Sequence, residues 1–177
     1  LAGLSFFQKV VDIQAKYLKL KNGQIVHNAI QTNGTLLNDD WANFFRVYNF
    51  DVGVSLDGDR ESHNRSRIDH TGKGSFDKLI KGIEILRRHK IEPGIIQTLT
   101  PDNLSRVKKD FHFFVDVLGI KSWSINPYLR VNGRNKNVSF QMITNADFVK
   151  FLKDTIDLWL GYDDPNVRIR EIENFAA

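Results

Sequence analysis

The sequence predicts an α/β fold: most of a barrel in which about four parallel strands alternate with helices. Apolar runs of strand length occur at 25–30, 50–56, 93–99 and 120–127. The longer segments between them carry apolar residues at helical spacing, behind polar residues suited to capping a helix. Because parallel neighbours need long crossover connections, this alternation predicts a parallel sheet.

The first half of the chain contains a helix and then one strand–helix–strand unit. Residues 4–18 carry apolar side chains at helical spacing, and Asn22-Gly23 predicts that this helix ends in a left-handed turn. The run 25–30 is expected to be a strand. Asn38 is placed to cap the helix that returns the chain to the strand 50–56.

The second half repeats the same alternation. Ser75 is predicted to cap the helix before the third strand, and Asn103 to cap the helix that Gly119 ends before the fourth. After a polar loop, Thr144 is placed to cap a last, long helix. The tail 167–175 is short and mixed, and its pattern favours neither a helix nor a strand.

One face of the predicted sheet lacks a cover. If all crossovers share one hand, the helices cover a single face, whereas a parallel sheet is normally buried on both. A complete eight-stranded barrel needs about 250 residues, and this chain has 177. Either the barrel is partial and open, or flanking segments lie outside this sequence.

Composition restricts the classes of function. The chain is 41% hydrophobic, enough for one domain with a core, and its 25 basic and 21 acidic residues are interleaved, which gives no support to a nucleic-acid partner. No apolar run reaches the roughly 20 residues that span a bilayer, and the beginning lacks a signal-peptide pattern, so we expect a soluble, cytoplasmic protein without a membrane partner. The absence of cysteine excludes disulfides and thiolate-bound metal from these residues.

Polar residues at the ends of the first two strands are the candidate site. Gln31 and Asn33 follow one apolar run, and Gly34 allows close approach of a ligand, although Asn33-Gly34 is also good turn chemistry, the alternative that spacing alone favours. Ser55 ends the next strand. Arg67 follows in a loop, where its guanidinium suits a carboxylate or phosphate unless it is an ordinary surface arginine.

Two other polar patterns point less clearly to a function. Asp57, Asp59, Glu61 and His63 alternate with a spacing that suits the ligands of a magnesium or calcium ion. They lack the EF-hand signature, and a charged turn is the preferred interpretation. Asp57 is also placed to fix the backbone beyond its strand. The segment 72–75 before a helix lacks the strand and further glycines of a phosphate-binding loop.

Taken together, several motifs resemble the radical S-adenosylmethionine (SAM) enzymes, with the closest likeness to anaerobic sulfatase-maturating enzymes and related SPASM peptide maturases. The likeness covers most of residues 1–130 in order and spacing. The motifs that carry it are 30–37 with Asp40-Trp41, 52–58, His63, Arg67 and 72–76. The resemblance implies a partial (β/α)6 TIM-like barrel, of which these strands are the third to sixth.

The resemblance also implies roles for individual residues. Ser55 and Arg67 are expected to bind the amino-acid end of S-adenosylmethionine, and Gln31 and Asn33 to line the barrel mouth. Near the end of the last strand, Tyr128 and Leu129 are expected to pack by the adenosine. A [4Fe-4S] cluster is implied as well, with its three-cysteine motif upstream of this chain and an auxiliary-cluster domain downstream, so that residues 1–177 are the central part of the enzyme.

By the same resemblance, the full-length protein oxidises or cross-links a side chain in a protein or ribosomal peptide and draws electrons from a low-potential donor. Without thiolate ligands, the present residues alone are expected to be inactive. Nothing in the sequence separates sulfatase maturation from peptide cross-linking. The alternative is a cluster-free α/β barrel module that binds a nucleotide or peptide without catalysis, which the absence of cysteine supports.

Overall fold

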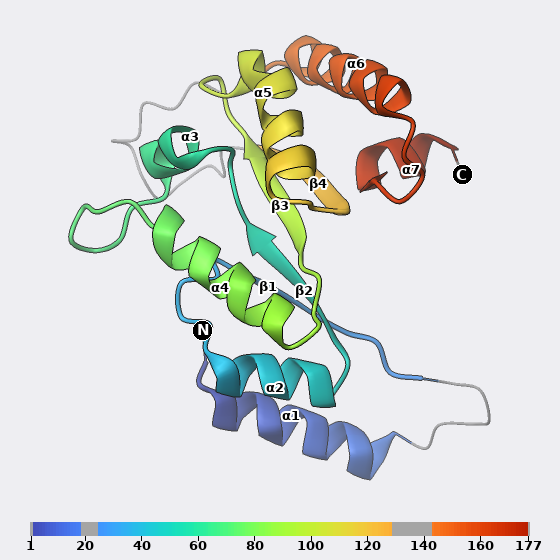
Figure 1. The fold of residues 1–177 in the computed structure, drawn as a ribbon. Helices are drawn as coiled ribbons and strands as arrows, with labels where there is room; N and C mark the ends of the chain where they lie inside the picture. Colours follow the sequence, from blue (N-terminus) through green and yellow to red (C-terminus); the bar gives the residue numbers. More distant parts are fainter. Residues whose placement is uncertain (1, 19–24, 129–142, 177) are drawn as a thin grey trace.

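The computed structural model describes residues 2–18, 25–128 and 143–176 of the chain (Figure 1). Its centre is a five-stranded parallel sheet in which the strand order, β1-β2-β3-β4-β5, follows the chain. Consecutive parallel neighbours are the arrangement of an α/β barrel wall, so the predicted fold class is confirmed. The strands are β1 (Asn28–Thr32), β2 (Phe50–Ser55), β3 (Gly94–Leu99), β4 (Ser122–Pro127) and β5 (Arg168–Ile169).

Helices connect the strands, as the alternation predicts. The segment before β4 begins as a 3-10 turn and ends in a π-helical turn. The helices are α1 (Leu4–Tyr17), α2 (Asp39–Val47), α3 (Arg60–Ser66), α4 (Phe76–Arg88), η1 (Leu104–Arg106), α5 (Val107–His112), η2 (Phe113–Val117), α6 (Asn145–Tyr162) and α7 (Arg170–Ala176).

The strands differ from their predicted bounds at the two edges of the sheet. The first strand was expected at 25–30, but β1 continues through Gln31 and Thr32, which pair in register with Gly53 and Val54 of β2. Backbone pairing with β2, and not the end of the apolar run, therefore determines where β1 ends. In the tail 167–175, β5 is only two residues long and pairs with the beginning of β4. Two residues are too few to show the alternation from which a strand is predicted.

All four residues predicted to cap helices lie at N-cap positions, but only two of them cap with their side chains. Asn38 accepts a hydrogen bond from the Trp41 backbone N–H at 3.0 Å, and Thr144 forms a reciprocal capping box with its helix. The Ser75 hydroxyl instead donates to the carbonyl of the preceding loop, 3.0 Å away. Asn103 accepts from the Thr100 N–H at 2.8 Å and so closes the turn after β3.

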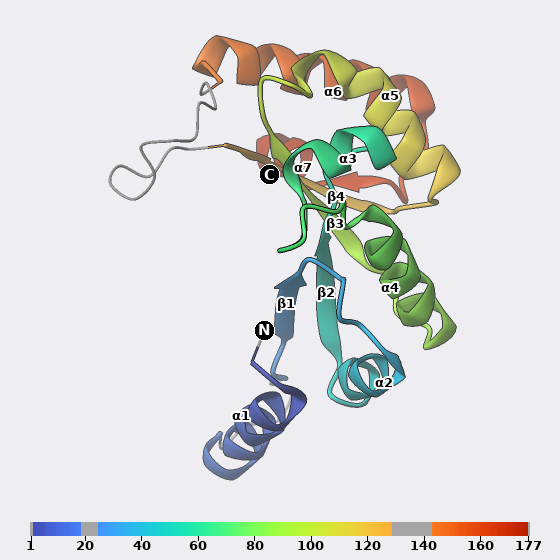
Figure 2. The ribbon, with the colours of Figure 1, turned by 90° about the vertical axis from the view of Figure 1, so that its left-hand side faces the viewer.

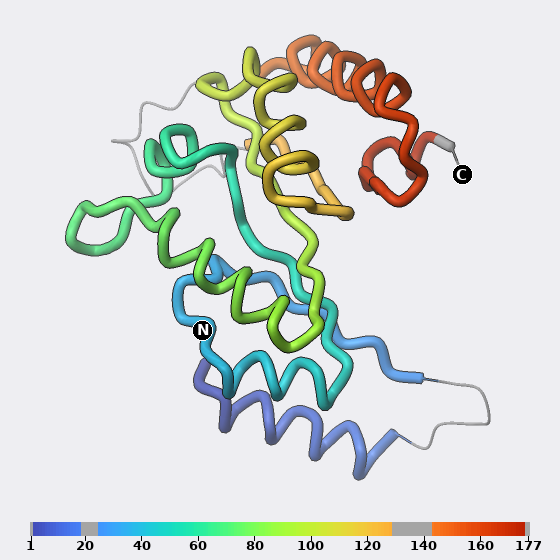
Figure 3. Tube along the Cα trace, viewed as in Figure 1, coloured from blue at the N-terminus to red at the C-terminus, as the bar shows by residue number. Residues whose placement is uncertain are grey.

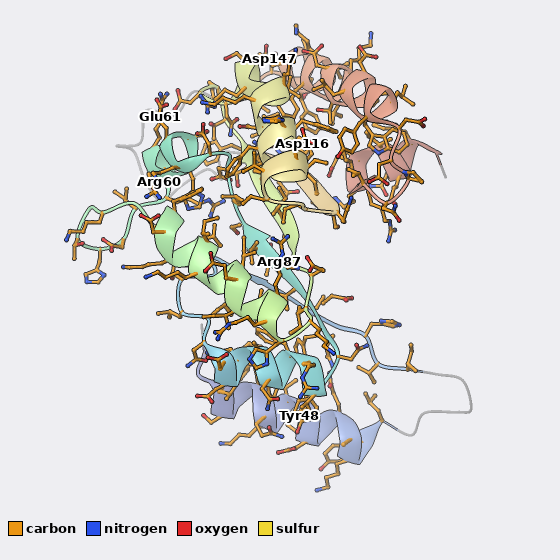
Figure 4. The ribbon with its side chains drawn as sticks, in the orientation of Figure 1. Tyr48, Arg60, Glu61, Arg87, Asp116 and Asp147 are labelled. Atoms are coloured by element: carbon orange, nitrogen blue, oxygen red, sulfur yellow. The ribbon has the colours of Figure 1, made fainter. Side chains whose placement is uncertain are left out.

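The charged turn predicted after β2 is wrong, because part of it is the helix α3. Asp59 caps this helix by accepting a hydrogen bond from the Ser62 N–H at 3.0 Å. Arg60 and Glu61 lie on its solvent-exposed side (Figure 4) and pair with neighbouring charges instead of gathering at one point. All seven residues of α3 are polar, so it carries no apolar periodicity from which a helix could be predicted.

The helices cover one face of the sheet. Figure 2 shows α2, α4 and α5 along one side of the strands. Strand residues that point to this side, such as Val54, Ile95 and Ile125, are at most 1% exposed. They pack against apolar helix residues such as Leu79 and Phe114, which are fully buried. Burial of this apolar area is the main force that holds the sheet and helices together.

The opposite face of the sheet is open, as the single hand of the crossovers predicts. Ala29, Gln31, Asp51 and Ser122 point to this face and are exposed although they lie within strands. A cavity of about 660 Å³ lies over it, lined by strand residues of β1 to β5. Small or polar residues on this face therefore leave room for other groups.

Helices at the two ends of the sheet complete the fold. At one end, α1 packs on α2: the Phe7 and Trp41 rings meet at 5.4 Å, and Gln8 donates to the Tyr48 hydroxyl at 2.8 Å (Figure 4). At the other end, α6 lies against α5 and α7. Within the ranges that the structure describes, every helix is too short or too polar to cross a lipid bilayer.

Candidate functional site at the strand ends

The carboxyl ends of β1 to β4 bring polar side chains together on the open face. Side chains alternate between the two faces along each strand. This alternation places four polar residues on the open face: Gln31, Ser55, Thr98 and Asn126. Their apolar neighbours, such as Val54 and Leu99, face the helices. Thr98 and Asn126 are partners in the register of β3 and β4. In α/β barrels this edge is where binding and catalytic residues sit.

Gln31 and Ser55 meet at this edge, as the sequence leads us to expect. The Gln31 side-chain amide donates to the Ser55 hydroxyl oxygen over 3.3 Å. Ser55 is 6% exposed, so its hydroxyl lies at the base of the mouth and not on the surface. This contact leaves the Ser55 hydroxyl proton available to a ligand oxygen above the strand ends.

Arg67 is held against the same edge by a carboxylate. Its Nε lies 2.5 Å from Asp57 Oδ2 and its Nη2 lies 3.0 Å from Asp57 Oδ1. Nη2 also donates to the Thr98 hydroxyl at 3.1 Å, which places the guanidinium beside the open face. The Arg67 side chain is only 26% exposed, so it is not the solvated surface arginine of the alternative interpretation.

The buried carboxylate of Asp57 accepts hydrogen bonds at both of its oxygens. In addition to Arg67, it accepts a hydrogen bond from the Thr98 backbone N–H at 2.8 Å. Asp57 thereby connects the end of β2 to the end of β3 as well as to the loop after α3. A charged group can be buried at this position because donors surround it.

The arrangement suits an anionic ligand group. The Arg67 hydrogen bonds within the described residues use Nε and Nη2, so the Nη1 edge can donate to a bound oxygen. The Ser55 hydroxyl supplies another donor at the neighbouring strand end. A guanidinium and a hydroxyl at a protected edge are typical of carboxylate or phosphate recognition.

The other predicted site residues lie differently. Asn33 accepts hydrogen bonds from the backbone N–H and hydroxyl of Thr35, at 3.3 and 3.0 Å, and so stabilises its own turn. Gly34 adopts a φ of +72°, as the turn alternative predicts. The backbone N–H of Tyr128 donates to the Leu99 carbonyl at 2.9 Å, which places Tyr128 near the mouth. Leu129 lies outside the described residues.

Sequence reasoning missed two polar residues near these strands. Thr98 occupies the polar end of an apolar run, as Ser55 does, and this shared position was the available signal. Asp110 is a lone acid on the apolar face of α5. It accepts from the Gln97 amide at 2.7 Å on the helix-covered side, and burial raises the pKa of this carboxyl to about 7.

Comparison with known proteins gives a family match over much of the chain. The model of the Radical SAM superfamily matches residues 5–114. The chain is 33% identical over 159 residues to a cysteine-type anaerobic sulfatase-maturating enzyme of Clostridium novyi, covering 90% of this chain and 42% of that protein. It is 40% identical over 114 residues to a serine-type enzyme of Bacteroides thetaiotaomicron, covering 64% and 27%.

Solved structures resemble this one over most of its length. The structure of native anSMEcpe with bound AdoMet and Cp18Cys peptide superposes with a TM-score of 0.84 at 32% identity, covering 97% of this chain and 48% of that one. Streptococcus suis SuiB shares the fold, with a TM-score of 0.61 at 16% identity. The chain spans less than half the length of each of these relatives that it matches.

Proposed function

Since the chain belongs to the Radical SAM superfamily, we propose that it is the S-adenosylmethionine-binding portion of an enzyme that uses radical chemistry on a protein or peptide substrate. Its similarity to cysteine-type and serine-type sulfatase-maturating enzymes favours oxidation of a side chain in a sulfatase. The second candidate reaction is cross-linking of a side chain in a ribosomal peptide, as a SPASM enzyme would perform it. We also propose that the protein is cytoplasmic.

The observation that carries the proposal is the position of Arg67. Its guanidinium is fixed by Asp57 and Thr98 beside the open face, next to the strand end that holds Ser55. A solved relative with this fold contains AdoMet. The methionine part of that molecule ends in a carboxylate, which is the group that a guanidinium edge and a hydroxyl bind well.

On this proposal, the residues of the chain bind and orient the cofactor. Arg67 donates through Nη1 to the methionine carboxylate, while Asp57 prevents the guanidinium from turning away. Ser55 donates its hydroxyl proton to the same carboxylate, and Gln31 holds the Ser55 oxygen in place. When bound, S-adenosylmethionine supplies the radical chemistry for which the superfamily is named, and fixed positioning is the contribution of the protein.

The residues of this chain do not fit an iron-sulfur cluster. The sequence contains no cysteine, and the described residues contain no group of three potential metal ligands. Thiolates are the usual ligands of such clusters. We therefore assign the [4Fe-4S] cluster of the full-length protein, with its low-potential electron donor, to ligands outside this chain, and we expect residues 1–177 alone to be inactive.

The test is equilibrium binding of S-adenosylmethionine to the full-length protein by calorimetry. Arg67→Ala is expected to raise the dissociation constant roughly tenfold or more, since a charge-assisted hydrogen bond contributes about 1.5–3 kcal/mol. Arg87→Ala is the control, because Arg87 is a residue of α4 that pairs with Glu92 and not with the strand-end residues. Equal affinity of Arg67→Ala and the unmodified protein would refute the site. A protein that binds nucleotides or peptides but no S-adenosylmethionine would support the cluster-free module.

A further inference from the structure

His63 lies buried behind the Asp57–Arg67 pair. It is a residue of α3 and only 1% exposed. Its Nδ1 lies 3.4 Å from the backbone N of Asp57, and its Nε2 lies 3.0 Å from the hydroxyl oxygen of Ser75, which itself is buried. A buried imidazole with a partner on each nitrogen joins the end of β2 to the beginning of α4.

The direction of these hydrogen bonds follows from the backbone. The Asp57 N–H can only donate, so His63 Nδ1 must accept, and the ring proton must lie on Nε2. Nε2–H therefore donates to Ser75 Oγ. Burial lowers the pKa of His63 to about 4, so the ring stays neutral and keeps its acceptor.

Ser75 connects the His63 side chain to the Arg67 backbone. The Ser75 hydroxyl and the Ser75 backbone N–H both donate to the Arg67 carbonyl oxygen, each at 3.0 Å. The Arg67 backbone N–H donates to the His63 carbonyl, also at 3.0 Å. Both polar groups of the Arg67 backbone are thus held by the two residues that lie behind the ion pair.

These contacts together form a closed ring of hydrogen bonds that begins and ends at Asp57. From the Asp57 backbone it runs through the His63 ring, the Ser75 hydroxyl and the Arg67 backbone, and then through the Arg67 guanidinium to the Asp57 carboxylate. We call these four residues the strand-end ring. It fixes the backbone from which the Arg67 side chain extends as well as the carboxylate that the guanidinium contacts.

We propose that His63 and Ser75 are positioning residues for cofactor binding, which act through the strand-end ring to set the direction of the Arg67 guanidinium. The inference rests on the proposed function of Arg67. Neither residue is expected to touch the cofactor, because both are buried behind Asp57 and Arg67.

The loop around Arg67 has other anchors, which makes a specific role for the ring testable. Figure 3 shows the loop between α3 and α4 projecting from the sheet. Ile68 and Gly74 form a bridge across it, and Asn64 accepts from the Phe76 N–H at 3.0 Å. Because these anchors hold the loop without His63 or Ser75, loss of the ring should misdirect Arg67 while the loop stays folded.

The experiment measures S-adenosylmethionine affinity in the full-length protein by calorimetry, with folding followed by circular dichroism. Ser75→Ala and His63→Phe are expected to raise the dissociation constant roughly tenfold, as for other losses of a buried hydrogen-bond partner. His63→Asn should recover part of the affinity, since its amide oxygen can replace Nδ1 as the acceptor. Thr155→Val, which removes a buried hydroxyl in α6, is the control and should leave affinity unchanged.

A double-mutant comparison separates positioning from general destabilisation. If Ser75 acts through Arg67, then Ser75→Ala should have no further effect on affinity in the Arg67→Ala background. Independent, additive losses would overturn the inference, as would unchanged affinity in folded Ser75→Ala and His63→Phe variants. If the unmodified protein does not bind S-adenosylmethionine, or if Arg67→Ala binds it normally, the proposed function of Arg67 itself fails.

Discussion

The guanidinium of Arg67 and the carboxylate of Asp57 form a two-point ion pair between the loop after α3 and the end of β2, with Nε–Oδ2 and Nη2–Oδ1 distances of 2.5 and 3.0 Å. Thr98 contributes to the same junction through its backbone N–H and its hydroxyl. Three separate segments of the chain therefore depend on one carboxylate, which makes Asp57 the residue whose charge matters most for this edge.

Asp57→Asn is predicted to weaken both cofactor binding and folding. The amide keeps the shape of the carboxylate but lacks its charge, so it cannot hold the guanidinium at two points. We expect the free energy of unfolding to fall by about 1–3 kcal/mol, measured by urea denaturation. Asp12→Asn, at an exposed position of α1, is the control and should change neither. Full cofactor affinity in Asp57→Asn would contradict the orienting role of this carboxylate.

Asp110 is predicted to make the stability depend on pH. Burial raises the pKa of this carboxyl to about 7, and Arg106 Nε, at 3.8 Å, is too far for a hydrogen bond that would offset it. Because the folded protein holds this proton more tightly than the unfolded chain does, the contribution of Asp110 to stability is greatest below pH 4. It declines as the pH rises from about 4 to 7, by roughly 4 kcal/mol in all.

Asp110→Asn should remove this dependence, since the amide does not ionise. Unfolding by urea at pH 5 and at pH 8 measures the difference, and the variant is expected to gain stability over the unmodified protein mainly at pH 8. Asp116→Asn, in the same helical segment but partly exposed, is the control. Parallel pH profiles for the unmodified protein and Asp110→Asn would contradict the prediction.

Local patterns could predict the strands and the main helices, because apolar periodicity and burial agree in them. The shared hand of the crossovers predicted that the helices would cover one sheet face only. The position of Gln31 and Ser55 at the ends of neighbouring parallel strands predicted that they would share an edge. The Asp57–Arg67 pair was beyond such reasoning, because α3 lies between its members and has no apolar pattern. Only the folded α3, with the loop that follows it, brings the guanidinium back to the strand end.

The same limit applies to pairings that cross the sheet. Thr98 joins the site through a backbone N–H and a hydroxyl. Neither contact can be predicted from spacing, because Thr98 is 41 residues from Asp57 and 31 from Arg67. Ser75 and Asn103 occupy N-cap positions without a side-chain cap for a related reason. Their side chains contact a loop carbonyl and the turn after β3 instead.

Gly82→Ala is predicted to destabilise the fold although alanine favours helices. A Cβ at this position of α4 would lie 2.4 Å from the Gly34 carbonyl oxygen, a backbone atom that cannot move away alone. The matched control is Gly161→Ala in α6, where a Cβ would meet nothing within 4 Å. We expect the control to gain up to about 1 kcal/mol of stability and Gly82→Ala to lose stability in the same urea assay. Similar gains in both variants would contradict the close approach of α4 to the β1 turn.

Glu171 is predicted to stabilise the edge of the sheet in place of a longer β5. The strand pairs with β4 only at Arg168 and Ile169. Beyond them, the Glu171 carboxylate accepts from the Ile125 backbone N–H at 2.9 Å and pairs with Arg170. The side chain thus substitutes for the carbonyl that a continued strand would offer, and it satisfies a backbone donor that would otherwise be left without a partner.

Glu171→Ala should therefore cost about 1–3 kcal/mol of stability, the typical penalty for an unsatisfied buried donor. Glu171→Gln keeps an acceptor oxygen and should cost less, and Glu173→Ala, which removes an exposed partner of Arg168, should cost little. Amide hydrogen exchange provides the direct measurement: in Glu171→Ala the Ile125 N–H should exchange faster than in Glu173→Ala. Equal protection of this N–H in the two variants would show that the carboxylate does not hold the edge of β4.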